Sequence, residues 1–274
     1  MTQKAPSPKV IEAMFCMQAG RFDEAERHCR TALASEPANL EALQVLAAAS
    51  VRQARNAEAV GVLETAVRHR PDNADCRFML GSVLRSLGRR AEAMEQYTQA
   101  LAINPDLAEA HNNMGVLRHD RGELEPAISC YREALARNPG HIEARRNLAA
   151  ALRSLSRIEE ALDEFETLLT YQPGNAYAAL MVMHSKRELC RWQDFYAMAE
   201  RVCEIAATQP GKFSPLLLLA WPVPPELLLA AARAYAATFN APCLPPQLSA
   251  MPRAADRKLR IGYFSADFRD KKVV

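Results

Sequence analysis

The chain has 274 residues, of which 49% are hydrophobic and 24% are charged, an ordinary composition for a protein with a buried core. Its formal net charge of +2 is too small to favour a nucleic acid or an anionic membrane as partner. The seven cysteines form no CxxC pair, so we expect reduced thiols in a cytoplasmic protein. The apolar stretch 213–232 contains four prolines, which argues against a membrane span.

A proline recurs every 34 residues along most of the chain. The positions are Pro37, Pro71, Pro105, Pro139 and Pro173. Alanines keep the same spacing at Ala25, Ala59, Ala93, Ala127 and Ala161. A period of this length, held over five units, predicts a solenoid of stacked helix pairs.

The third unit, residues 74–107, illustrates how each repeat is expected to fold. Gly81 in its first helix and Ala93 in its second are small, so the two helices can approach closely, and Tyr97 fills the space beside them. Gly88 lies between the helices, where glycine adopts the left-handed conformation that ends a helix at little steric cost.

Further signals mark the boundaries between units. Pro105 cannot continue a helix, and Asp106, with Glu109 three residues later, predicts a capped start of the next one. In the first unit, Pro6 and Pro8 fall where the first helix should begin. We therefore expect that helix to start late.

The alternation of small and large residues, with a turn between two helices in every unit, resembles the tetratricopeptide repeat. The resemblance covers residues 6–175 and implies an all-α fold, a right-handed superhelical solenoid whose first helices line a concave groove. Such a groove holds a protein or an extended peptide. The five repeats are expected at residues 6–39, 40–73, 74–107, 108–141 and 142–175, followed by a degenerate sixth helix pair at 176–210 in which residues 187–195 replace the usual turn.

The repeat's register predicts which residues line the groove, and this lining is mixed, with arginine favoured. In the fourth unit it consists of Asn112, Asn113, Val116, His119 and Asp120. A clamp for a C-terminal carboxylate is excluded, because its lysine and asparagine positions hold other residues. Asn113 and Asn147 share a repeat position at which asparagines can bind a peptide backbone, since an amide both donates and accepts hydrogen bonds. The alternative for both is a solvated asparagine.

After the repeats we expect a helical junction and a proline-rich linker at residues 211–257. At residues 258–274 the composition changes, and Leu259–Ser265 has the alternation and the aromatic content of a β-strand. Residues 258–270 resemble the opening of the catalytic region in O-linked N-acetylglucosamine transferases (glycosyltransferase family 41, SPINDLY-like). Three earlier segments, in order, resemble the stretch that joins repeats to enzyme in the bacterial members: residues 189–195, 213–219 and 224–236.

This second resemblance implies transfer of N-acetylglucosamine from a UDP-sugar to Ser or Thr of a protein by two Rossmann-like lobes. The chain would then contain only the first, truncated strand of those lobes. Lys271 stands where the family has its active-site histidine, and a lysine is a poor replacement because it is protonated at neutral pH. We therefore expect no catalytic residue in this chain, and UDP-N-acetylglucosamine as cofactor only if the missing lobes are present.

No other chemistry is indicated. The six histidines show no metal-ligand spacing, and there is no phosphate-binding loop or nucleophile motif. Three functions stay open. The first is a protein-interaction scaffold, the substrate-recruiting arm of a protein O-N-acetylglucosaminyltransferase that is not catalytic alone. The second is a fragment of a longer active transferase, and the third is a free-standing adaptor unrelated to glycosylation.

Overall fold

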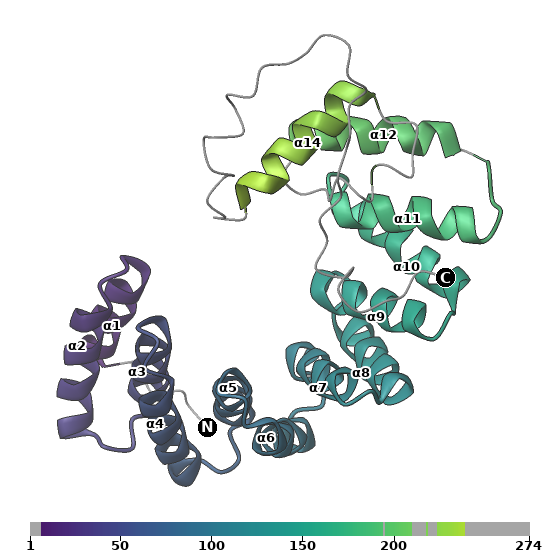
Figure 1. Cartoon of the computed structure of the whole chain (residues 1–274). Coiled ribbons are helices and arrows are strands. Elements are labelled where there is room, and N and C mark those ends of the chain that lie inside the picture. Colours follow the sequence, from purple (N-terminus) through teal and green to yellow (C-terminus); the bar gives the residue numbers. More distant parts are fainter. Residues whose placement is uncertain (1–6, 194, 210–217, 219–223, 239–274) are drawn as a thin grey trace, which may run out of the picture.

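The computed structural model describes residues 7–193, 195–209, 218 and 224–238 (Figure 1). All regular structure in these residues is α-helical, as predicted. The helices are α1 (Pro8–Gln18), α2 (Phe22–Ser35), α3 (Leu40–Arg52), α4 (Asn56–His69), α5 (Ala74–Ser86), α6 (Arg90–Ile103), α7 (Ala108–Asp120), α8 (Leu124–Arg137), α9 (Ile142–Ser154), α10 (Ile158–Tyr171), α11 (Ala176–Glu188), α12 (Phe195–Thr208) and α14 (Pro225–Thr238). The strand predicted within residues 258–274, and Lys271 with it, lies outside the described residues.

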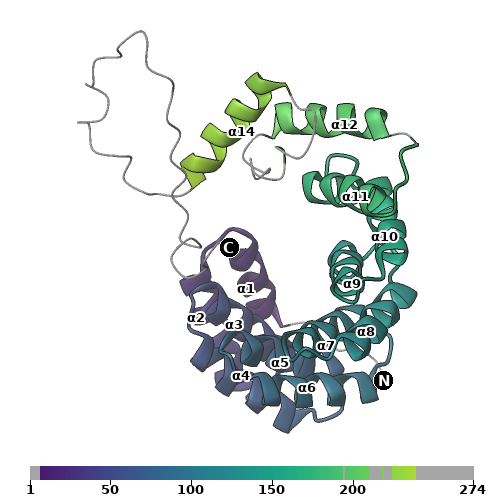
Figure 2. The same cartoon turned by 45° about the vertical axis from the view of Figure 1, so that its right-hand side comes forward.

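Successive helices from α1 to α12 pack as antiparallel pairs, and the pairs follow one another along a curve (Figure 2). In this view α7, α9 and α11, the first helices of three pairs, lie on the inner side of the curve, and α8, α10 and α12 lie on the outer side. The late start of the first helix is confirmed, because α1 has 11 residues where α3 has 13.

Small buried residues hold the two helices of each pair close together. The five alanines of the 34-residue period are all 0% exposed. A Cβ atom built on Gly81 would stand 2.8 Å from Cε1 of Tyr97, and one on Gly115 would stand 2.6 Å from Cε1 of Tyr131. Both tyrosines are fully buried. The predicted pairing of a small residue with a large one is therefore a steric requirement of the fold.

The turn inside each pair has the same backbone conformation six times. One residue per turn has a positive φ, and these residues are 34 apart: Gly20, Ala54, Gly88, Gly122, Ser156 and Cys190. The next residue donates its N–H to a carbonyl near the end of the preceding helix, as from Arg89 to Leu84 at 3.0 Å. This arrangement is the Schellman motif, which satisfies carbonyls that the helix end leaves free.

Two local predictions are wrong. The usual turn is not replaced in the sixth pair, because Cys190 has a φ of 53° and Arg191 donates its N–H to the Lys186 carbonyl at 2.8 Å. Asp106 does not cap α7 either. The N-cap residue is Leu107, which has no capping side chain, whereas Asn73 at the same repeat position accepts the Cys76 N–H at 2.8 Å.

Glycine at the turn position should stabilise the repeats that lack it. We expect Ala54→Gly and Ser156→Gly each to raise the free energy of unfolding by about 0.5–1 kcal/mol, because a side chain in the left-handed region costs about 1–2 kcal/mol and glycine returns part of that as chain entropy. The measurement is urea denaturation followed by circular dichroism. The matched control is Gly88→Ala, which should destabilise although a Cβ there would meet nothing within 4 Å. A loss of stability in both glycine variants would contradict the strain argument.

Candidate functional site: the inner surface

The inner surface is built from the first helix of each pair, and its charges are ordered along the helix axis. The first turns carry an acidic row: Glu41, Asp75, Glu109 and Glu143. The last turns carry a basic row, again 34 residues apart: Arg85, His119, Arg153 and Arg187. Both rows complement the helix macrodipole, which favours anions at the start of a helix and cations at its end.

Residues of the basic row differ in whether their side chains already form hydrogen bonds or ion pairs within the chain. Arg153 donates to Ser185 Oγ at 3.0 Å and to Glu188 at 3.1 Å, so its guanidinium links α9 to α11. The side chain of Arg85 is exposed and makes no hydrogen bond or ion pair within the described residues. It is therefore available to a carboxylate of a partner. The repeat register already predicts Arg85, His119 and Arg153 on the groove. Their alignment as one row that Arg187 continues was not predicted, although the 34-residue spacing is visible in the sequence.

The structure separates the three asparagines of the predicted site. Asn112, expected to line the groove, is only 5% exposed, so that prediction is wrong. Its side-chain oxygen accepts a hydrogen bond from Nδ2 of Asn147 at 3.0 Å, which joins α7 to α9. Asn113 is partly exposed and makes no hydrogen bond within the described part of the chain. In the side-chain amide of Asn147, the second N–H and the carbonyl oxygen take no part in the bond to Asn112.

An aromatic contact lies beside these polar groups in the third repeat. The rings of Phe78 and Tyr97 are 6.0 Å apart between centroids and inclined at 39°. The Tyr97 hydroxyl donates to Ser82 Oγ at 3.2 Å, so the polar end of this buried residue is satisfied. Phe78 and Met79 are half-buried on α5. The inner surface thus changes from apolar at α5 to amide-rich at α7 and α9.

The described residues contain no cluster that could hold a metal ion, and burial lowers the reactivity of several of their thiols. No group of three or more histidine, cysteine, aspartate or glutamate side chains within them could hold a metal ion. The six cysteines among them are all free thiols. Burial raises the pKa of Cys29 to about 11 and raises those of Cys76 and Cys130 as well, so these thiols are poor nucleophiles at neutral pH. Within the same residues no helix has the length and apolar character to cross a membrane.

Pairs of antiparallel helices that repeat every 34 residues are typical of α-helical repeat proteins. Comparison with known families identifies these repeats. Residues 17–77 and 108–141 each match a family model described as tetratricopeptide repeat, and residues 81–120 match one described as TPR repeat. Residues 17–77 and 81–141 are therefore tetratricopeptide repeats. No curated protein sequence matches it.

Solved structures with the same fold include three tetratricopeptide-repeat proteins. MamA is 22% identical, covering 65% of this chain and 99% of its own, with a TM-score of 0.54. PilW, a type IV pilus biogenesis factor, is 24% identical, covering 77% and 96%, with a TM-score of 0.64. YrrB, described as having an unusual peptide-binding site, is 23% identical, covering 66% and 91%, with a TM-score of 0.52. At these identities the likeness establishes the fold alone, and none of the three is named as a glycosyltransferase.

The buried asparagine should matter for stability and its exposed neighbour should not. We expect Asn112→Ala to lower the free energy of unfolding by about 1 kcal/mol, because a buried side-chain hydrogen bond contributes roughly that much. Asn113→Ala, one residue along the same helix, is the matched control and should change stability by less than about 0.5 kcal/mol. Urea denaturation of both variants is the measurement. Equal effects would show that the Asn112–Asn147 bond does not hold α7 against α9.

Proposed function

We propose that the chain is a scaffold that binds an extended segment of a partner protein on its inner surface. The observation that carries this proposal is the unused hydrogen-bonding capacity of the inner helices. Asn113 has no partner within the described residues, and Asn147 retains a donor and an acceptor beyond its bond to Asn112. Both amides occupy the same repeat position on adjacent first helices, so they can bind successive peptide groups of one extended chain.

The basic row adds a preference for acidic partners. Arg85 has no counter-ion within the described residues, and it lies on the face of α5 that also carries Phe78, because residues seven apart are two helical turns apart. A segment with an apolar residue over Phe78 and a carboxylate near Arg85 would use both. The shared fold with YrrB, which is described as having a peptide-binding site, supports a peptide as the occupant.

Removing the side-chain amides of Asn113 and Asn147 should weaken peptide binding. The loss of the Asn147–Asn112 hydrogen bond should lower stability by about 1 kcal/mol and leave the protein folded. A peptide selected for binding by display on the wild-type chain is the probe, and isothermal titration calorimetry measures its affinity. For Asn113→Ala combined with Asn147→Ala we expect at least a tenfold loss, because two hydrogen bonds at about 0.5–1.5 kcal/mol each are removed. Thr98→Ala is the matched control, since its hydroxyl contacts only the Met94 carbonyl of its own helix α6. An unchanged affinity in the double variant would exclude peptide binding by these amides.

We further propose that this scaffold is the recruiting arm of a protein O-N-acetylglucosaminyltransferase-like protein. The supporting observation is the sequence resemblance of residues 258–270, together with the three segments that precede it in the same order as in that family. The resemblance implies that sugar transfer is carried out by two Rossmann-like lobes, and the role proposed for the repeats is recruitment of the acceptor protein, not catalysis. The adaptor without any role in glycosylation is the competing function.

Mass spectrometry of captured partners distinguishes the two. Proteins that bind the wild-type chain, and not the Asn113→Ala/Asn147→Ala variant, should carry N-acetylhexosamine on Ser or Thr if the chain recruits transferase substrates. If those partners lack the modification, the glycosylation role is wrong and the scaffold role stands. Transfer of hexosamine to an acceptor protein by this chain and UDP-N-acetylglucosamine alone would overturn the expectation that it is not catalytic.

A further inference from the structure

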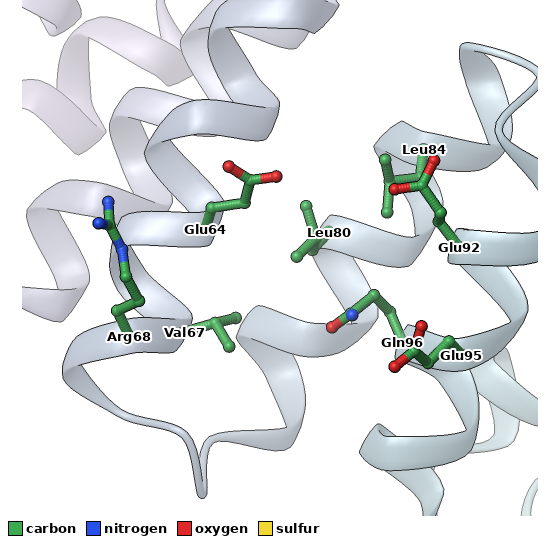
Figure 3. Close-up of a pocket in the computed structure, with 8 residues that line it drawn as sticks. All are labelled: Glu64, Val67, Arg68, Leu80, Leu84, Glu92, Glu95 and Gln96. Atoms are coloured by element: carbon green, nitrogen blue, oxygen red, sulfur yellow. The ribbon is translucent and has the colours of Figure 1, made fainter.

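A pocket of about 460 Å³ lies on the side of the second helices, between α4 and α6 (Figure 3). Its floor is apolar and consists of Val67 from α4 with Leu80 and Leu84 from α5, which are 4% and 3% exposed. Its rim carries three carboxylates and a single guanidinium, those of Glu64, Glu92, Glu95 and Arg68. This combination suits a ligand that is apolar along its length and cationic at its end.

The same place at two other junctions between repeats holds an ion pair across the junction. Arg30 donates to Glu58 at 2.9 Å between α2 and α4, and Arg132 donates to Glu160 at 2.7 Å between α8 and α10. Both pairs join residues 28 apart in the chain. At the pocket the corresponding residues are Glu64 and Glu92, so a carboxylate stands where these two junctions have a guanidinium. In the remaining repeats the position of Glu64 holds Thr98, Glu166 and Glu200.

The equivalent glutamates Glu160 and Glu92 differ in one hydrogen bond, which Glu160 accepts from across its junction and Glu92 lacks. Glu160 accepts two hydrogen bonds from Arg157, at 2.6 and 2.7 Å, and a further one from Arg132. Glu92 accepts the same two bonds from Arg89, at 2.7 and 2.6 Å, and no further cation reaches it within the described residues. The Glu160 site therefore demonstrates that this carboxylate geometry accommodates a second guanidinium.

Two more groups at the pocket can accept a hydrogen bond. The Glu64 side chain makes no hydrogen bond or ion pair within the part of the chain that the structure describes, although it interacts electrostatically with Arg89. The side-chain oxygen Oε1 of Gln96 is buried and has no hydrogen-bond partner, and Figure 3 shows its amide directed into the space between α4 and α6. Buried acceptors are normally paired, so this oxygen marks a place where a donor fits. Arg68 does not bond to it; the side-chain hydrogen bond of its guanidinium goes to Thr65 of its own helix, at 3.0 Å.

We propose that this pocket binds the arginine side chain of a partner protein, at a site separate from the inner surface. The aliphatic stem lies on Leu80 and Leu84, and the guanidinium donates to Glu64, Glu92 and Gln96. Arginine is favoured over lysine because its planar fork offers five donors and is more weakly hydrated than an ammonium. The partner thus provides the cation that Arg30 and Arg132 provide within the chain at the other junctions.

The test uses N-acetyl-arginine N-methylamide as the probe, with the citrulline compound as its neutral isostere, titrated at millimolar concentration into the ¹⁵N-labelled chain. We expect saturable amide shifts centred on Glu64, Leu80, Glu92 and Gln96, at least tenfold weaker binding of citrulline, and weaker binding at high salt. Equal binding of the two compounds, or shifts centred elsewhere, would overturn the proposal.

Two variants make the test specific. Glu64→Arg places a guanidinium beside Glu92 as Arg30 stands beside Glu58, so it should abolish binding of the arginine probe while the protein stays folded. Glu200→Arg is the matched control, because it makes the same charge change at the same repeat position, 136 residues further along the chain, and should leave probe binding unchanged. Equal loss in both variants would mean that only overall charge matters and would overturn the pocket. The Asn113→Ala/Asn147→Ala variant should bind the probe normally, so this proposal and the peptide-binding proposal fail separately.

Discussion

The close approach of the two helices in each pair is the contact on which the rest of the structure depends. Tyr131 lies against Gly115 so tightly that a single methyl group there would collide with its ring. Each pair buries its apolar face only against its neighbours, so this contact must be made again in every repeat. Because the contact uses one side of each helix, the residues of the inner and outer surfaces are free to vary from repeat to repeat.

The periodic part of this fold could be predicted because the same residue meets the same neighbour in each repeat. The roles of Ala93 and Gly88 can be predicted without knowing any distant contact, because helix crossing and turn geometry are local. Cys190 could not be predicted from side-chain type, because the hydrogen bonds of the Schellman motif belong to the backbone and tolerate a non-glycine residue at a modest cost. Leu107 lacks a capping side chain, yet α7 still forms from the next residue on, because packing against its neighbours stabilises it.

The candidate site was predicted less well, and the asparagines explain why. Asn112 and Asn113 are adjacent in the sequence and share a helix, yet one is 5% exposed and bonded to α9 while the other is partly exposed and unbonded. Their difference depends on the angle between α7 and α9, which the sequence does not state. Sequence register therefore located the inner surface to within one residue, and only packing decided which amide remains available to a partner.

In a repeat protein, the equivalent residues of the other repeats are a reference against which an unusual residue can be compared. Position by position, Arg30, Glu64 and Arg132 have the same backbone, the same turn of helix and the same facing helix. Packing cannot account for the change from arginine to glutamate, because the residue is exposed at the pocket and the apolar floor below it is intact. Glu64 and Glu92 carry like charges across one junction, and Arg89, which interacts with both, offsets part of their repulsion. The α4–α6 junction thus lacks the ion pair that the α2–α4 and α8–α10 junctions form, over an apolar floor and beside an unpaired buried acceptor, and these features favour a cation supplied by a partner.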